Sequence, residues 1–299
     1  MKLLVVGSVG LDTVKTPKGE VKEVLGGSAS YFSVAASFFT PVNLVAVVGT
    51  DFPKEYVHLF LSRKINTDGL KTGNGKTFRW KGAYAYDLNE ARTIWTHLNV
   101  FKDFNPTLPQ DYRHSQYIFL ANIDPELQRN ILKQIHSPKV TACDTMNYWI
   151  ENKKAQLLKL LKDVNLFILN DVEARKLTQE PNLMKAARAI KRLGPQIIVI
   201  KKGEHGAMML IKSDFFSIPA YPLEELFDPT GAGDSFAGGM IGYLTKQDKM
   251  DEATLKHSVV YGTVLASFCV EDFSLNRLKQ LNLSSIKKRY REFEFLTHF

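Results

Sequence analysis

The chain has 299 residues, of which 44% are hydrophobic and 23% are charged, and its formal net charge is +8. This composition is ordinary for a soluble globular protein, and the length allows one or two domains. No stretch approaches the roughly 20 apolar residues that span a membrane. The apolar run after Met1 is too short for the core of a signal peptide. We therefore expect a cytoplasmic protein without a membrane partner.

The positive charge is compatible with two kinds of partner, an anionic ligand such as a nucleotide phosphate or a nucleic acid. No basic run contains interleaved aromatic residues, and the densest cluster, KKRYRE at 287–292, is interpreted as a solvated helix face. We therefore predict no nucleic-acid partner. The two cysteines, Cys143 and Cys269, have neither CxxC nor zinc spacing and are expected to be buried, reduced thiols.

Short apolar runs and helical patterns alternate along the chain. The apolar runs are continuous, which is typical of strands buried on both faces of a parallel sheet. In chain order, the runs lie at 2–7, 42–49, 115–122, 139–144, 164–170 and 196–203, and helical patterns lie at 28–39, 125–135 and 182–193. This alternation predicts a layered α/β fold with right-handed crossovers.

Two regions break this alternation. Residues 12–27 are mostly polar and contain a PKG turn, which predicts a hairpin. Residues 75–99 are rich in aromatic side chains that alternate with polar ones, which predicts a half-exposed sheet. We predict a small β subdomain, built from about 12–25 and 75–99 and inserted in the α/β core. A sheet over the mouth of the core would act as a lid, and the alternative is a surface sheet without a role in the site.

Polar residues follow the predicted strands, at the edge of the sheet where ligands bind in open parallel folds. Any one of them could be a turn former or a helix cap, so the pattern alone predicts a cluster and assigns no role. These residues are Asp12, Asp51, Asn147, Asn170, Glu173, Lys201, Gly203 and Gly206.

The stretch LFDPTGAGDSFAGGM, at 226–240, places a glycine-rich turn directly before an apolar helical pattern. Gly231, Ala232 and Gly233 are predicted to form this turn, where free N–H groups and the helix dipole favour an anion. Asp234 is interpreted as a general base that takes the proton of a hydroxyl attacking phosphorus. The alternative is that Asp234 caps the helix and that the glycines only make the bend.

In this order, the motifs resemble those of the ribokinase-like (PfkB) family of carbohydrate and nucleoside kinases. DPTGAGDSFAGG resembles the C-terminal signature of the family, and GGSASYFSVAASF resembles its Gly-Gly signature. LNDVE resembles the Asn-x-x-Glu element, and KKGEHG resembles the nucleotide-binding turn. The resemblance implies a single domain over 1–299, with a three-layer α/β/α core, a mostly parallel sheet and a small β-sheet lid.

The resemblance also implies a role for each site residue. Asp234 would be the catalytic base, and Gly231, Ala232 and Gly233 would form the anion hole. The hydroxyls of the acceptor would be held by Asp12, Gly26 and Gly27, and we add Tyr31 and Asn147 as predicted contacts of the acceptor that the family pattern does not itself give. ATP would be bound by Lys201, Gly203, Gly206 and Thr230, and Mg²⁺ would be held through water by Asn170 and Glu173. Asp228 begins a signature that the family links to a monovalent cation such as K⁺.

Three departures from the family pattern leave the acceptor open. Tyr31 stands where the Gly-Gly signature usually has Asn, DTMN at 144–147 lacks the usual proline, and 261–274 differs from the ribokinase version. Tyr31 could narrow the pocket or stack on a ring of the acceptor. The first hypothesis is therefore an ATP-dependent kinase of a small carbohydrate, and the second is a nucleoside kinase. A catalytically silent homologue is a third, against which the intact Asp234 argues. A homodimer through the lid is also predicted.

Overall fold

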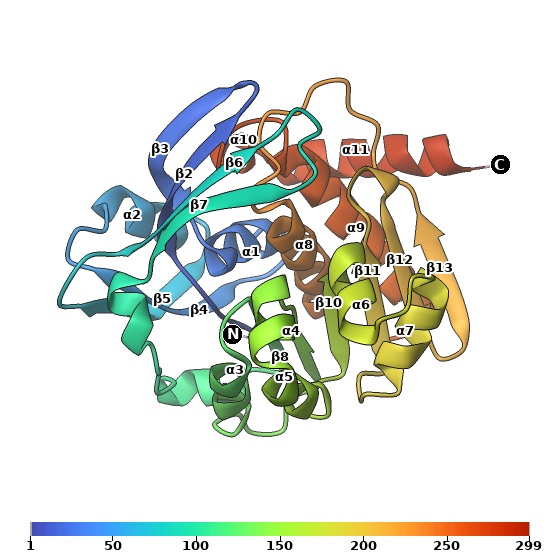
Figure 1. The fold of residues 1–299 in the computed structure, drawn as a ribbon, viewed down its shortest axis with the longest axis horizontal. Helices are drawn as coiled ribbons and strands as arrows, with labels where there is room; N and C mark the ends of the chain where they lie inside the picture. The colour runs from blue at the N-terminus through green and yellow to red at the C-terminus, as the bar shows by residue number, and fades with distance from the viewer. Residues whose placement is uncertain (1, 299) are drawn as a thin grey trace.

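The computed structural model describes residues 2–298, and within this range the strands form one nine-stranded sheet and one four-stranded sheet (Figure 1). The order in the large sheet is β13-β12-β11-β10-β9-β8-β1-β4-β5. The six predicted apolar runs supply its parallel strands β1 (Leu3–Val6), β4 (Val42–Gly49), β8 (Tyr117–Leu120), β9 (Val140–Cys143), β10 (Leu166–Asn170) and β11 (Ile197–Lys201). β5 (Ile65–Gly73) extends one edge in parallel, and β12 (Ala207–Ile211) and β13 (Asp214–Ile218) extend the other in antiparallel.

Successive residues of the central strands face two separate cores. In β1, Leu3 and Val5 belong to one core and Leu4 and Val6 to the other. The first core is covered by α1 (Ser28–Ala36), α2 (Lys54–Ser62), α8 (Ala232–Gln247), α9 (Glu252–Cys269), α10 (Asn276–Gln280) and α11 (Leu283–Thr297). The second is covered by α3 (Pro125–Leu132), α4 (Asn147–Asn152), α5 (Lys154–Leu161), α6 (Asp171–Thr178), α7 (Leu183–Lys191) and the 3₁₀ turns Asn99–Asp103 and Gln110–His114. The predicted three-layer α/β/α architecture is confirmed.

The four-stranded sheet, called the small sheet below, projects from one end of this core (Figure 1). Its order is β3-β2-β6-β7, with β2 (Gly10–Thr16), β3 (Gly19–Gly26), β6 (Phe78–Tyr84) and β7 (Ala91–His97). β2 pairs with β3 in antiparallel and with β6 in parallel. The small sheet therefore joins the two regions, about 12–25 and 75–99, that the sequence singled out.

Asp51, one of the strand-end carboxylates, anchors the small sheet to the core. Its Oδ1 accepts hydrogen bonds from the backbone N–H and the hydroxyl of Thr77, both at 2.7 Å. Its Oδ2 lies 2.8 Å from a guanidinium nitrogen of Arg79 on β6. Arg79 also pairs with Glu23 on β3, at 2.7 Å, so one guanidinium joins two strands of the small sheet to the end of β4.

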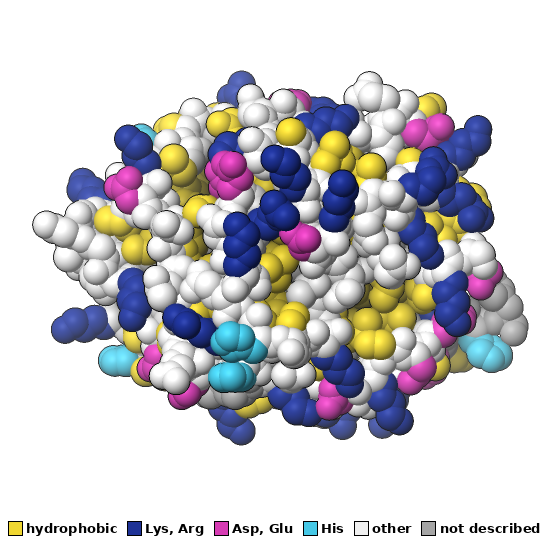
Figure 2. All heavy atoms as spheres, turned by 90° about the horizontal axis from the view of Figure 1, so that it is seen from below, with side chains coloured by type: hydrophobic (Ala, Val, Ile, Leu, Met, Phe, Trp, Pro, Cys, Tyr) yellow, Lys and Arg dark blue, Asp and Glu magenta, His cyan; other side chains and the backbone are white. Residues whose placement is uncertain are grey.

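The charged side chains lie mostly on the surface, as the sequence predicts for the cluster at 287–292. Figure 2 shows Lys and Arg spread over the whole face in view, with Asp and Glu among them. Most side chains of 287–292 are exposed on α11, whereas Arg289 turns inward and pairs with Glu271. Both cysteines are free and buried, as predicted. Along residues 2–298, no helix has the length and apolar character needed to cross a membrane.

Candidate active site

The carboxyl ends of the parallel strands and the start of α8 bring several predicted residues together. Asn170 ends β10 and is the register partner of Lys201, which ends β11. Asp144 follows β9, and its charge interacts with those of Lys201 and Asp234. Of the strand-end residues expected from the sequence, Asn170, Glu173 and Lys201 thus lie together, with Asp144 beside them, whereas Asp51 is engaged with Thr77 and Arg79 of the small sheet.

The glycine turn, residues 230–233, leads directly into α8. Gly231 is the N-cap residue in the left-handed region, with φ +75°, and no side chain caps the helix. The helix begins at Ala232, so Asp234 lies within its first turn and the alternative role of Asp234 as the cap is wrong. A Cβ at Gly231 would lie 2.3 Å from the Tyr31 ring, so only glycine fits both the conformation and the space.

Lys201 is the cation of this site. A Cβ at Gly233 would lie 2.6 Å from Lys201 Nζ, so the ammonium group lies against the first turn of α8. Burial raises the pKa of Asp234 to about 6, and the charge of Lys201 opposes that rise. Burial also raises the pKa of Asp144 and of Glu173, and Lys201 opposes both shifts. One ammonium group thus interacts with the charges of three carboxyl groups, of which Asp234 lies in the first turn of α8.

Asn170 and Glu173 have a structural role at the start of α6. The Asn170 N–H donates to Glu173 Oε2 at 2.7 Å, and the Glu173 N–H donates to Asn170 Oδ1 at 2.8 Å. This capping box accounts for their spacing without a ligand. Among the described residues, no group of three or more His, Cys, Asp or Glu side chains is placed to hold a metal ion directly. Their role toward Mg²⁺ through water stays a prediction.

Asp12 lies on β2 and is 96% buried, in contact with the two glycines that end β3 and begin the next turn. A Cβ at Gly26 would lie 1.9 Å from Asp12 Oδ2, and Gly27 has φ +89°. Burial raises the pKa of Asp12 to about 7, the Gly27 amide opposes the shift, and the charges of Asp228 and Asp234 add to it. The glycines thus let the backbone approach a buried carboxyl group that neighbours Asp234.

Comparison with known families matches residues 2–280 to the pfkB family of carbohydrate kinases. The chain belongs to this family. It is 30% identical over 258 residues to a cytidine kinase of Thermococcus kodakarensis, with 84% of this chain and 91% of that protein covered. It is 24% identical to an inositol 3-kinase of Arabidopsis thaliana, over 96% of this chain and 78% of that protein. The crystal structure of Methanocaldococcus jannaschii nucleoside kinase superposes with a TM-score of 0.78 at 20% identity, over 98% and 99% of the two chains.

The structure of this pfkB-family kinase adds polar atoms that the sequence did not single out. Ser30 Oγ, Asp144 Oδ1, Thr145 Oγ1 and Asn147 Oδ1 are buried and lack a hydrogen-bond partner in the described part of the chain. Buried polar atoms are normally paired, so these are candidates for contacts with a bound ligand. Of the four residues, only Asn147 was predicted. The sequence places Asp144, the first residue of DTMN, at a strand end, but it does not reveal that Asp144 lies near Lys201.

The two glycines after Lys201 differ in their surroundings. Gly206 has φ +83°, and a Cβ there would lie 2.1 Å from the Ile218 carbonyl oxygen. Its carbonyl accepts a hydrogen bond from the Lys202 N–H at 2.7 Å, so Gly206 shapes the turn between β11 and β12. A Cβ at Gly203 would have no neighbour within 4 Å, which leaves that backbone open to a ligand.

Asp228 is fully buried and connects three segments of the kinase. Its Oδ1 accepts from the Thr230 N–H at 2.9 Å, and its Oδ2 accepts from the Ser274 N–H at 3.0 Å. The Ser274 hydroxyl donates to the Leu25 carbonyl at 2.6 Å. Both carboxylate oxygens thus have protein donors, and this arrangement offers no support for the monovalent cation suggested by the resemblance.

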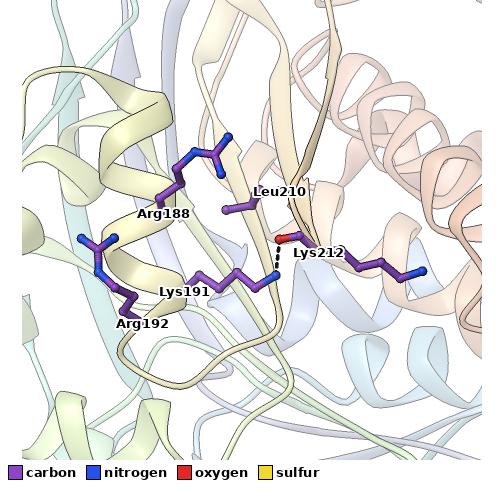
Figure 3. Close-up of a pocket in the computed structure, with 5 residues that line it drawn as sticks. All are labelled: Arg188, Lys191, Arg192, Leu210 and Lys212. Atoms are coloured by element: carbon purple, nitrogen blue, oxygen red, sulfur yellow. Dashed lines mark hydrogen bonds between the residues drawn. The ribbon is translucent and has the colours of Figure 1, made fainter.

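A hollow on the surface lies away from these residues (Figure 3). It has a volume of about 380 Å³ and is lined by Arg188, Lys191, Arg192, Leu210 and Lys212, between α7 and β12. Lys191 donates to the Lys212 carbonyl, and Arg188 lies 5.0 Å from the Phe215 ring, so these cations attach α7 to the β12–β13 hairpin. The hollow lies at the opposite end of the strands from Lys201, because Ile211, the last residue of β12, pairs with Ile197, the first residue of β11.

Asp12→Asn is expected to stabilise the kinase at about pH 8. The folded pKa of about 7 lies above the ordinary value of 3.8, so the folded state binds the proton more tightly than the unfolded state. The free energy of unfolding therefore falls as pH rises from about 4 to 7, and the full penalty applies above pH 7. Removing the charge should raise Tm by roughly 4–8 °C at pH 8, which corresponds to about 2 kcal/mol. Thermal melts of both proteins at several pH values measure this, and an equal or larger gain near pH 4 would contradict it.

Proposed function

We propose that this pfkB-family kinase transfers the γ-phosphoryl group of ATP to the primary hydroxyl of a nucleoside. The observation that carries the chemistry is the placement of Asp234 and Lys201 at the glycine turn that begins α8. A protein catalyses phosphoryl transfer mainly by positioning the reactants and by stabilising the charge that develops. The N–H groups of the turn, the helix dipole and Lys201 supply the positive potential, and Asp234 supplies the base.

The choice of a nucleoside reverses the order of the two hypotheses drawn from the sequence, in which a small carbohydrate came first. The names of the relatives support the change. The relative at 30% identity is named a cytidine kinase, and further relatives are named nucleoside kinases. Tyr31, which stands where the family usually has Asn, is 1% exposed and packs on Gly231, so its ring does not offer a face for stacking on an acceptor and gives no support to either hypothesis.

In the proposed reaction, Asp12 accepts hydrogen bonds from hydroxyl groups of the acceptor. Asp234 takes the proton of the attacking hydroxyl, for which a pKa of about 6 is well matched at neutral pH. The turn and Lys201 stabilise the charge that develops on the transferred group. Asn170 and Glu173 would hold Mg²⁺ through water, and the metal would neutralise phosphate charge when bound. A structural neighbour, a putative ribokinase II of E. coli, was solved with ATP and Mg²⁺.

Release of ADP from ATP and Mg²⁺ tests this function. The acceptor panel contains nucleosides, free pentoses and hexoses, phosphosugars and inositol, each with the native enzyme and with Asp234→Asn. Turnover with nucleosides, lost in the variant, is the expected result. Turnover confined to free sugars or inositol would overturn the nucleoside assignment and keep the kinase chemistry. No turnover with any acceptor would contradict the proposal.

The predicted homodimer through the small sheet stays a prediction. We also infer that the small sheet serves as a lid over the acceptor, because Asp12 lies on one of its strands and Tyr84, on another, reaches the glycine turn. A covered site excludes the water that would otherwise hydrolyse ATP.

A further inference from the structure

One side chain of the small sheet contacts the glycine turn directly. Tyr84 is the last residue of β6, and the hydroxyl of Thr230 donates to the Tyr84 hydroxyl at 3.1 Å. Burial raises the pKa of Tyr84 far above its ordinary range, so the phenol stays neutral and can share this hydrogen bond at any working pH. Thr230 immediately precedes Gly231, which sets the entry to α8.

The backbone of Thr230 is held by the core, whereas its side chain faces the small sheet. The Thr230 N–H donates to Asp228 Oδ1 at 2.9 Å, and its carbonyl accepts from Cys269 Sγ at 3.6 Å. The hydroxyl of Thr230 donates to the Tyr84 hydroxyl at 3.1 Å, and it also lies near the Asp228 carboxyl group, where it opposes the rise in the pKa of that group caused by burial. The orientation of Thr230 therefore depends on both the core and the small sheet.

The turn has little freedom to absorb a change at Thr230. Gly231 is fixed at φ +75° and packs on the Tyr31 ring, and the Ala232 N–H donates to the Pro229 carbonyl at 3.1 Å, so a rotation at Thr230 is transmitted to the N–H of Gly233. Groups that stabilise developing charge are effective only when they are aimed before the reaction. Loss of the hydrogen bond through a change at Tyr84 would therefore weaken the site while leaving Thr230, a predicted contact of ATP, in place.

We propose that Tyr84 is a positioning residue that couples closure of the small sheet to the alignment of the glycine turn. The proposal rests on the phosphoryl transfer proposed above. When the small sheet covers the acceptor, the Tyr84 hydroxyl holds Thr230, and through it the N–H groups of the turn, in the arrangement that receives the phosphoryl group. When the sheet opens, the turn loses this support, so charge stabilisation is complete only in the covered site.

Other contacts keep the small sheet in place independently of Tyr84. Arg79 pairs with Asp51 at 2.8 Å, Lys18 pairs with Glu225, and Ser274 donates to the Leu25 carbonyl at 2.6 Å. None of these involves a residue of the glycine turn. Tyr84→Phe thus removes the coupling and leaves the attachment of the sheet intact.

The kinetic test compares Tyr84→Phe with Tyr86→Phe, a control whose side chain is 93% exposed. Tyr84→Phe is expected to lower kcat by about 3- to 10-fold, as for one lost hydrogen bond, while KM for the acceptor changes by less than about twofold. Thr230→Val should produce a similar loss, and the double variant should be no worse than Thr230→Val alone. The coupling would be overturned if the losses in kcat of Tyr84→Phe and Thr230→Val multiplied in the double variant, or if Tyr86→Phe lost as much activity as Tyr84→Phe.

A second measurement needs no substrate and separates this proposal from the proposed function. The amides of Thr230 and Ala232 donate to Asp228 Oδ1 at 2.9 Å and to the Pro229 carbonyl at 3.1 Å, and their hydrogen exchange in the free enzyme is expected to be about 3- to 10-fold faster in Tyr84→Phe than in the native protein or in Tyr86→Phe. Unchanged exchange would overturn the coupling even if nucleosides are phosphorylated. Faster exchange would support the coupling even if the acceptor proves to be a sugar.

Discussion

Asp234→Asn is expected to lower kcat by about 10²- to 10⁴-fold, the typical contribution of a general base. Asparagine keeps the shape of the side chain and cannot accept the proton of the attacking hydroxyl. Because the first turn of α8 is not capped by this side chain, the fold should be retained. The variant should still bind ATP, which a nucleotide-induced rise in Tm measures. Asp214→Asn, at an exposed position on β13, is the matched control.

The same residue sets the expected pH dependence. The pKa of Asp234 is raised to about 6, and a base works only when deprotonated. Activity of the native enzyme, as kcat/KM, should therefore fall as pH decreases through about 7 to 6, where the acceptor-binding Asp12 and then Asp234 become protonated, and should be flat above about 8. An acid limb centred near 4 would show that the carboxylate is not desolvated as the structure indicates. Full activity of Asp234→Asn would remove its assignment as the base.

Lys201→Met is the second substitution with a large expected effect, a loss in kcat of about 10²- to 10³-fold. Methionine fills a similar volume and removes the charge beside the glycine turn. The loss of a positive charge also removes the influence that opposes the raised pKa of Asp234. The acid limb of kcat/KM should therefore move to higher pH, measured on the residual activity.

The control for this substitution is Lys202→Met, which makes the same change in charge at the adjacent position. It should leave both kcat and the acid limb near their native values. A uniform loss of activity in both variants would indicate an effect of net charge on nucleotide attraction, since such an effect does not depend on position within the cluster. A loss in Lys201→Met without a shift of the acid limb would contradict the electrostatic contact with Asp234.

The central strands could be predicted because they are buried on both faces. Their sequences are continuous apolar runs, and all six runs form strands of the large sheet. β5 was not predicted, since INTDGLKTG lies at an edge and is partly exposed, so its sequence contains more polar than apolar residues. β12 and β13 also escaped prediction. They form an antiparallel hairpin on the edge of a sheet whose other strands alternate with helices.

Parts of the candidate site could be predicted where a short sequence motif determines the local backbone geometry. The glycine turn, the Gly26-Gly27 pair and the capping spacing of Asn170 and Glu173 are local features, so their sequences carry the signal. Contacts between distant segments are different. The hydrogen bond that Thr230 donates to Tyr84 and the one that the Ser274 N–H donates to Asp228 depend on how distant segments meet, and no spacing in the sequence encodes that.

Asp12 and Asp234 are neighbours in space, but they belong to different parts of the fold. Asp12 is carried by β2 of the small sheet, and Asp234 is carried by α8 of the large core. On the function proposed above, recognition of the acceptor and chemistry on phosphorus would be encoded in separable stretches of the gene. Mutations in 10–26 and 78–97 would then alter acceptor preference during evolution while the catalytic apparatus is inherited unchanged. A scaffold divided in this way offers one physical account of how members of a single family come to bear the names of cytidine, inositol and fructose kinases.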